Sequence, residues 1–263
     1  IVTGAGAVDL GGVIGGDDAL SALNINAEGG TGNIDVTSIG DNDPARGVTG
    51  TVVLGNANTG TLDLDGTNYD VGAITFGGSN TLEFSGSTGN FETAGDIRFL
   101  GNVKINGDMT FDSGGGDITF DGTIVGTDGD ETLTLDTGES TGEVTLSGNV
   151  GASDFIESLS IIGAEGINLG STIKLSNSAG GLIDLDGNVI LTANTTLNSS
   201  ANNGSVDISG TINNQSGQSA KNLTITSGTG AVGLGSTTAH IGTTTAIGGL
   251  TINNTTGSGN ITI

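Results

Sequence analysis

The sequence contains no cysteine, no tryptophan, one tyrosine and one proline in 263 residues. Without cysteine the chain can form neither a disulfide bond nor a thiolate metal site. Its apolar runs are only a few residues long, whereas a membrane-spanning helix needs about 20. Five Lys and Arg face 29 Asp and Glu, for a net charge of −24. Nucleic acids and anionic membranes both require basic surfaces, so we predict neither as a partner.

Glycine is abundant, with 51 residues, yet the chain has no three-residue glycine period and is not collagen-like. Apolar residues make up 33% of the chain and are patterned, which argues against disorder. They recur as triplets of apolar, polar and apolar residues bounded by Gly, Asn, Asp or Ser. This alternation predicts short half-buried strands, and no segment shows the 3.6-residue pattern of a helix. The clearest triplets are Leu62–Leu64, Ile74–Phe76, Ile118–Phe120, Leu133–Leu135, Val144–Leu146 and Leu223–Ile225.

A longer unit begins at Val8, Ile118, Val144 and Val206, each with Gly two residues before and four residues after. The abundant glycines suit corners that need positive φ. A constant step of about 26 residues, within the range typical of stacked repeats, separates Val8 from Ile34, Ile118 from Val144, and Val206 from Val232. Such a period, with glycine corners and no helix, predicts an all-β parallel β-helix of roughly ten coils. The register across residues 40–115 is irregular.

We expect residues 1–263 to form a single β-solenoid with an acidic part, 1–186, and an Asn-, Ser- and Thr-rich part, 187–263. Both ends of the sequence read as strands, and the chain does not start with Met. We therefore expect a fragment of a longer repetitive protein.

Calcium is the metal that this composition favours, because it prefers oxygen ligands. The candidate ligands are Asp128, Asp130, Glu131 and Asp154, and separately Asp41 and Asp43. Asp128 and Asp154 are one period apart and should lie one above the other on neighbouring coils. The acids form either a calcium site or a solvated acidic stripe. No other cofactor is predicted.

The segment LDLDGTNYDVGAITFGGSNTLEFSG (62–86) is similar to passenger repeats of rickettsial-type outer-membrane autotransporters. The chain as a whole resembles large bacterial surface proteins of the filamentous-haemagglutinin and autotransporter-passenger kind. The resemblance implies a right-handed parallel β-helix, export through a Gram-negative envelope and an extracellular location at the bacterial cell surface.

The predicted function is therefore that of a structural or adhesive module in a stalk, adhesin, biofilm, fibre or surface layer. Its partners would be further copies of itself, through end-to-end or lateral assembly, or receptors and glycans on host or neighbouring cells. The alternatives are a carbohydrate-active β-helix enzyme, either a lyase or a hydrolase, and a calcium- or glycan-binding module. Glycoside hydrolysis needs paired carboxylates, which are plentiful, but sugar sites also use aromatic platforms, which are scarce. A lyase also needs a cation beside the carboxylates, so we predict no enzyme activity.

Overall fold

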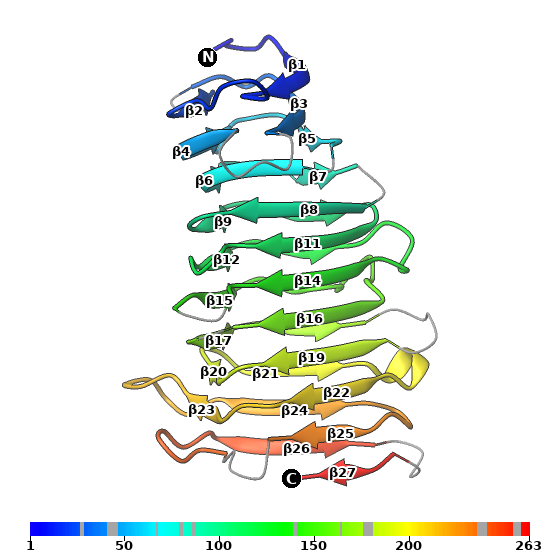
Figure 1. Ribbon diagram of the computed structural model, residues 1–263. Helices are drawn as coiled ribbons and strands as arrows, with labels where there is room; N and C mark the ends of the chain where they lie inside the picture. The colour runs from blue at the N-terminus through cyan, green and yellow to red at the C-terminus, as the bar shows by residue number, and fades with distance from the viewer. Residues whose placement is uncertain are drawn as a thin grey trace.

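The computed structural model describes residues 1–26, 29–40, 47–66, 68–78, 81–85, 88–138, 141–163, 165–175, 181–235, 241–254 and 259–263. These residues wind into a β-solenoid of about nine turns with a period of about 24 residues. The turns stack in sequence order, with the N-terminus at the top of Figure 1 and the C-terminus at the bottom. The predicted parallel β-helix is confirmed, with slightly fewer and shorter turns than expected.

The strands line three faces, and their parallel partners lie one turn above and one turn below. The first face contains β1 (Val8–Ile14), β3 (Ile34–Ile39), β5 (Leu62–Leu64), β7 (Leu82–Phe84), β10 (Val103–Ile105), β13 (Ile124–Val125), β18 (Thr172–Lys174), β21 (Thr195–Asn198), β24 (Asn222–Thr226) and β26 (Gly249–Asn253). Isolated bridges from Ile124 to Val150 and from Val150 to Ile173 connect its upper and lower parts.

The second face follows in each turn. It contains β6 (Asn68–Phe76), β8 (Thr88–Thr93), β11 (Asp108–Asp112), β14 (Thr132–Asp136), β16 (Ser158–Ile162), β19 (Leu182–Asp186), β22 (Ser205–Ile208), β25 (Val232–Leu234) and β27 (Ile261–Thr262). The long strands β1 and β3 turn the corner and reach this face at Ile14 and Ile39, above Tyr69.

The third face completes the turn. It contains β2 (Leu23–Ile25), β4 (Val48–Leu54), β9 (Ile97–Phe99), β12 (Ile118–Phe120), β15 (Glu143–Leu146), β17 (Gly166–Leu169), β20 (Val189–Leu191) and β23 (Ile212–Asn214), together with the second half of β6. The one helical element among the described residues is a short 3-10 turn, η1 (Ser200–Asn202).

A continuous apolar core runs along the axis, because side chains alternate between the two sides of a strand. On the third face, Ile97, Ile118 and Val144 stack as Cα partners and are almost completely buried. Their polar neighbours Arg98 and Thr119 point outward on the same strands. One turn cannot bury its own apolar side, so the core exists only because the turns stack.

Aromatic rings fill the core of the upper middle turns. Stacked pairs follow the axis: Tyr69 over Phe91 with ring centroids 5.0 Å apart, and Phe76 over Phe99 at 4.7 Å. The turns here are also short, since Leu82 pairs with Val103 and Val103 with Ile124, in steps well below the period that the sequence predicts. The turn from Ile34 to Leu62 is longer, so the irregular register that the sequence shows over residues 40–115 reflects turns of unequal length.

Asn and Asp residues immediately before strands or bridges join three successive turns. The backbone carbonyl of Asn102 accepts the N–H of Leu82 from the turn above, at 2.8 Å. Its side-chain Oδ1 accepts the N–H of Thr123 from the turn below, at 2.9 Å. The same double contact recurs at other corners and satisfies backbone groups just outside the strands. The equivalent residues are Asn33, Asp96, Asp117, Asn149 and Asn188.

Many described glycines have the positive φ expected at corners, such as Gly15, Gly55 and Gly151. Gly122 and Gly148 serve a different purpose. Gly122 and Gly148 do not have positive φ. A Cβ on Gly148 would lie 2.0 Å from the carbonyl oxygen of Gly122, and one on Gly122 would lie 2.2 Å from that of Gly101. Glycine is required here because the backbones of successive corners approach too closely for any side chain.

The three steps that the sequence predicts are all confirmed as Cα pairs: Val8 with Ile34, Ile118 with Val144, and Val206 with Val232. The three pairs lie on the first, third and second faces respectively. The repeated sequence unit is therefore not tied to one face, and its copies are not equivalent positions in the solenoid.

Replacing Phe91 with Ala should destabilise the protein by about 3–5 kcal/mol, because the cavity lies among four other rings that cannot close it. Urea denaturation followed by circular dichroism measures the change. The control is Thr110→Ala, an outward residue on β11, which should cost well under about 1 kcal/mol. Equal losses in the two variants would contradict a core held by ring packing.

Candidate functional surface

A ladder of carboxylates runs down the first face, and we call Asp9, Asp35, Asp63 and Glu83 the acidic ladder. Each is the outward middle residue of an apolar–polar–apolar triplet and the Cα partner of the next. The in-register pairing therefore holds like charges one strand spacing apart, about 4.7–4.9 Å along the axis. Like charges directly opposite each other destabilise a sheet.

A lysine closes the lower end of the acidic ladder. Lys104, the Cα partner of Glu83, places its Nζ 3.0 Å from the Glu83 Oε1. Higher up, the Ser85 hydroxyl donates to the Asp63 Oδ1 at 2.7 Å. Burial raises the pKa of Asp35 above its usual value, and the charges of Asp65, Asp63 and Asp9 raise it further. The Asp35 carboxylate therefore binds a proton more readily in the folded chain than in the unfolded chain.

The second face carries two similar rows. Glu92, Asp112 and Asp136 are successive Cα partners on β8, β11 and β14. Lower down, Asp184 pairs with Asp207. Burial raises the pKa of Asp184, and the neighbouring charges of Asp207 and Asp186 add to the effect.

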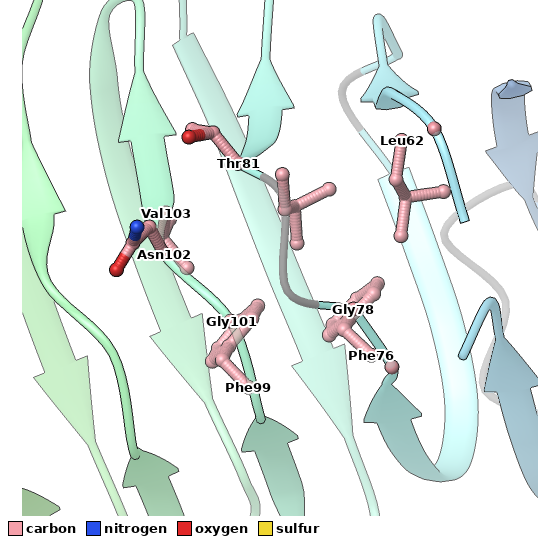
Figure 2. A pocket seen from close by; sticks show the side chains of 11 residues that line it. Leu62, Phe76, Gly78, Thr81, Phe99, Gly101, Asn102 and Val103 are labelled. Carbon is pink, nitrogen blue, oxygen red and sulfur yellow. The ribbon is translucent and has the colours of Figure 1, made fainter. Parts of the chain in front are cut away.

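Three surface depressions lie near these rows. One, of about 460 Å³, adjoins the end of the acidic ladder and is lined by Asn33, Gly60, Thr61, Thr81, Glu83 and Lys104. A second, of about 220 Å³, lies at the corner after the second face and includes Asp70 and Glu92. The third, of about 10 Å³, has room for about one water molecule. Figure 2 shows Phe76, Gly78, Phe99 and Gly101 around it at the corner between the third and first faces, with Leu62 and Val103 also lining it.

The described cations at strand centres each face a specific neighbour. The Arg98 guanidinium lies 2.9 Å from the Asp121 carboxylate, and Lys104 pairs with Glu83. The Lys174 ammonium lies over the Phe155 ring, 4.6 Å from its centroid. The depression with a carboxylate and a cation together is the one beside Glu83 and Lys104, where the two charges already pair with each other.

Of the candidate calcium ligands, Glu131 is buried and has its own partners. Its carboxylate accepts the backbone N–H groups of Thr127, of Asp128 at 2.8 Å and of Gly129 at 2.9 Å. Only 2% of Glu131 is exposed. The side chain therefore folds back into its own loop and holds it closed.

The other three candidate acids are exposed: Asp128 and Asp130 in the same loop as Glu131, and Asp154 in the corresponding loop of the next turn. Asp154 meets the neighbouring loop at Gly126, whose N–H donates to its backbone carbonyl at 3.2 Å, while Glu157 lies opposite Glu131. The two loops differ in path, so backbone pairing does not place Asp154 directly opposite Asp128. Asp41 and Asp43 lie outside the described residues. Within the described part of the chain, no group of three Asp, Glu or His has the arrangement of a metal site.

The sequence did contain a signal for the acidic ladder. Its members are the middle residues of the triplets Val8–Leu10, Ile34–Val36, Leu62–Leu64 and Leu82–Phe84. The steps between successive triplets are not the same, because the turns differ in length. Only the register seen in the structure therefore shows that the four acids are aligned.

No protein-family model, curated protein or solved structure matches this chain. The described residues contain no helix long and apolar enough to span a membrane.

Replacing Asp35 with Asn should stabilise the protein at about pH 7 and lose that advantage near about pH 3. The folded-state pKa of Asp35 is raised above its ordinary value of 3.8. Wild-type stability therefore falls as the pH rises through that pKa, and Asn removes the penalty. Thermal melting across this pH range measures the effect.

The control is Asp17→Asn, which removes the same charge outside the ladder in the first turn. It should leave the pH profile unchanged. A gain for Asp35→Asn that is equal at both pH values, or matched by Asp17→Asn, would rule out ladder repulsion as its cause.

Replacing Glu131 with Ala should cost about 2–3 kcal/mol, because three backbone N–H groups lose a charged acceptor that is itself buried. Asp128→Ala and Asp130→Ala, which remove exposed acids of the same loop, should be nearly neutral. Denaturation with and without millimolar calcium tests the other interpretation. Calcium stabilisation that Asp128→Ala, Asp130→Ala and Asp154→Ala abolish would show instead that the loops bind the ion.

Proposed function

We propose that this chain is a stiff structural or adhesive module of a large extracellular surface protein. The observation that carries the proposal is the continuous core, in which buried side chains of all three faces stack from Val8 to Leu234. Every turn is bonded to its neighbours along whole strands. Bending such a rod would break inter-turn backbone hydrogen bonds and core contacts at the same time. The solenoid is therefore suited to keep the parts at its two ends a fixed distance apart.

The outer surface of the solenoid has the polar composition of a rod that is exposed to solvent. Its outward positions are mostly Thr, Asn and Asp, and the net charge of −24 favours solubility and mutual repulsion of exposed molecules. The described inter-turn contacts are backbone hydrogen bonds and apolar packing, and a chain without cysteine forms no disulfide. The fold therefore does not depend on a particular redox compartment. Lateral positions such as Thr119 and Thr145 can vary without touching the core, which allows one scaffold to carry different binding surfaces.

The proposed location is the bacterial cell surface, and contacts with receptors or glycans would use lateral faces of the rod. A carbohydrate-active enzyme remains the alternative, and the 220 Å³ depression beside Asp70 and Glu92 is the place where its acids would act. A glycan- or calcium-binding module would use the same acidic faces without turnover.

Immunogold electron microscopy of the producing cells, with antibodies raised against this chain, tests the proposal. We expect intact cells to be labelled, with gold particles along structures that extend from the envelope. A matched sample with permeabilised cells measures the internal pool. Labelling that appears only after permeabilisation would overturn the surface role.

A further inference from the structure

The lower part of the first face is a four-stranded sheet in which β18, β21, β24 and β26 pair in register without a bulge. Figure 1 shows β21, β24 and β26 one below another in the lower part of the solenoid. Each strand contains a Thr, an apolar residue and a polar residue in succession, and the apolar residue faces the core, as Leu197 and Ile225 do. The outward side of this sheet therefore consists of two parallel columns of polar residues.

We call these two columns the threonine array. The first column is Thr in four successive turns, and the second has a lysine above three uncharged residues. The members are Thr172, Thr196, Thr224 and Thr251 in the first column, and Lys174, Asn198, Thr226 and Asn253 in the second. The charge in the array belongs to Lys174, whose ammonium is held over the Phe155 ring.

In-register pairing fixes the spacing of the threonine array in both directions. Along the axis its members are one strand spacing apart, about 4.7–4.9 Å, and between the columns they are two residues of one strand apart, about 6.6 Å. The β-branched Thr side chain has few rotamers, so its hydroxyl and methyl groups can take the same positions from turn to turn. Flat sheets are typically stabilised by stacking and by side-chain ladders, and both are present here.

The hydroxyl groups of the array are available to water. Among the described residues, those of Thr196, Thr224 and Thr251 have no hydrogen-bond partner in the protein. By contrast, the Thr123 hydroxyl, higher on the same face, donates to the Asn102 Oδ1 at 3.0 Å. The array hydroxyls therefore meet solvent at positions that the sheet determines.

Charge distinguishes the threonine array from the other outward columns. The upper part of the same face carries the acidic ladder, and the second face carries rows of acids such as Glu92 and Asp136. The third face carries Arg98 beside Asp121. A charged group is strongly hydrated and costs several kcal/mol to desolvate, so it keeps its own water shell. Within β18, β21, β24 and β26, all of whose residues the structure describes, no residue is acidic.

From these observations we propose that the threonine array binds ice. Oxygen atoms on the faces of hexagonal ice repeat at spacings close to those of the array, both along the axis and between the columns. Water molecules held by the Thr hydroxyls can therefore occupy positions of the crystal lattice, and bridging water of this kind is nearly as favourable as a direct hydrogen bond. The partner is a crystalline water surface, and the inference does not depend on the proposed location of the protein.

Incorporation of the chain into a slowly growing ice crystal tests the proposal, because such a crystal rejects ordinary solutes. Gel densitometry compares the protein in the melted ice with that in the remaining liquid. The wild-type chain should be incorporated. Thr224→Tyr places a bulky ring in the array and prevents close approach to a flat crystal, so incorporation should fall severalfold. The matched control is Thr134→Tyr, the same substitution at an outward position of β14 on the second face, which should be incorporated like wild type.

Thr196→Tyr, one turn above, is a second variant of the array, and circular dichroism melting verifies that each variant is folded. Rejection of the wild-type chain by growing ice overturns the proposal whatever the variants do. Folded Thr224→Tyr and Thr196→Tyr that are both incorporated like wild type also overturn it, as does an equal loss in Thr134→Tyr. None of these results bears on the surface labelling that tests the structural role.

Discussion

In-register parallel pairing between successive turns is the constraint on which the rest of this structure depends. It places chemically equivalent side chains above one another at the spacing of neighbouring strands, about 4.7–4.9 Å. Inside the solenoid this stacks Phe76 on Phe99, at a centroid distance of 4.7 Å, and lets aliphatic side chains form unbroken columns. Outside it stacks Asp9, Asp35 and Asp63, whose charges repel. The same geometry thus stabilises the core and imposes a cost on the surface, and the two cannot be separated.

The fold tolerates that cost because the ladders face water, where charge repulsion is screened and a proton or a neighbouring cation can relieve it. Lys104 pairs with Glu83 at the lower end of the acidic ladder, and Ser85 donates to Asp63. The Asn and Asp residues at the corners, by contrast, stabilise the stacking of the turns. Each one, as at Asn102, accepts hydrogen bonds from the turns above and below and so fixes the register that the core requires.

Sequence periodicity predicted the fold class and three inter-turn pairs correctly, because short alternating strands and a constant step between them can be read directly from the chain. It could not predict how the remaining turns align. The turns between Leu62 and Ile124 are shorter than the step of about 26 residues that the sequence predicts. The close contacts of corner glycines with the next turn were not predictable either. Those contacts, such as that of Gly148 with Gly122, exist only once the turns are stacked.

The candidate site shows the same limit of prediction from the sequence, which does not reveal contacts between turns. Acid content identified the loop around Asp128 and Glu131, but composition cannot tell a ligand from a side chain that caps its own backbone. Glu131 is buried and accepts three N–H groups, whereas Asp128 and Asp130 point to solvent. The acidic ladder was visible only as the centres of separate triplets, since its members are separated by unequal steps. In a solenoid the functional surface is therefore defined by register, and a side chain gains its neighbours from the turns above and below rather than from its own loop.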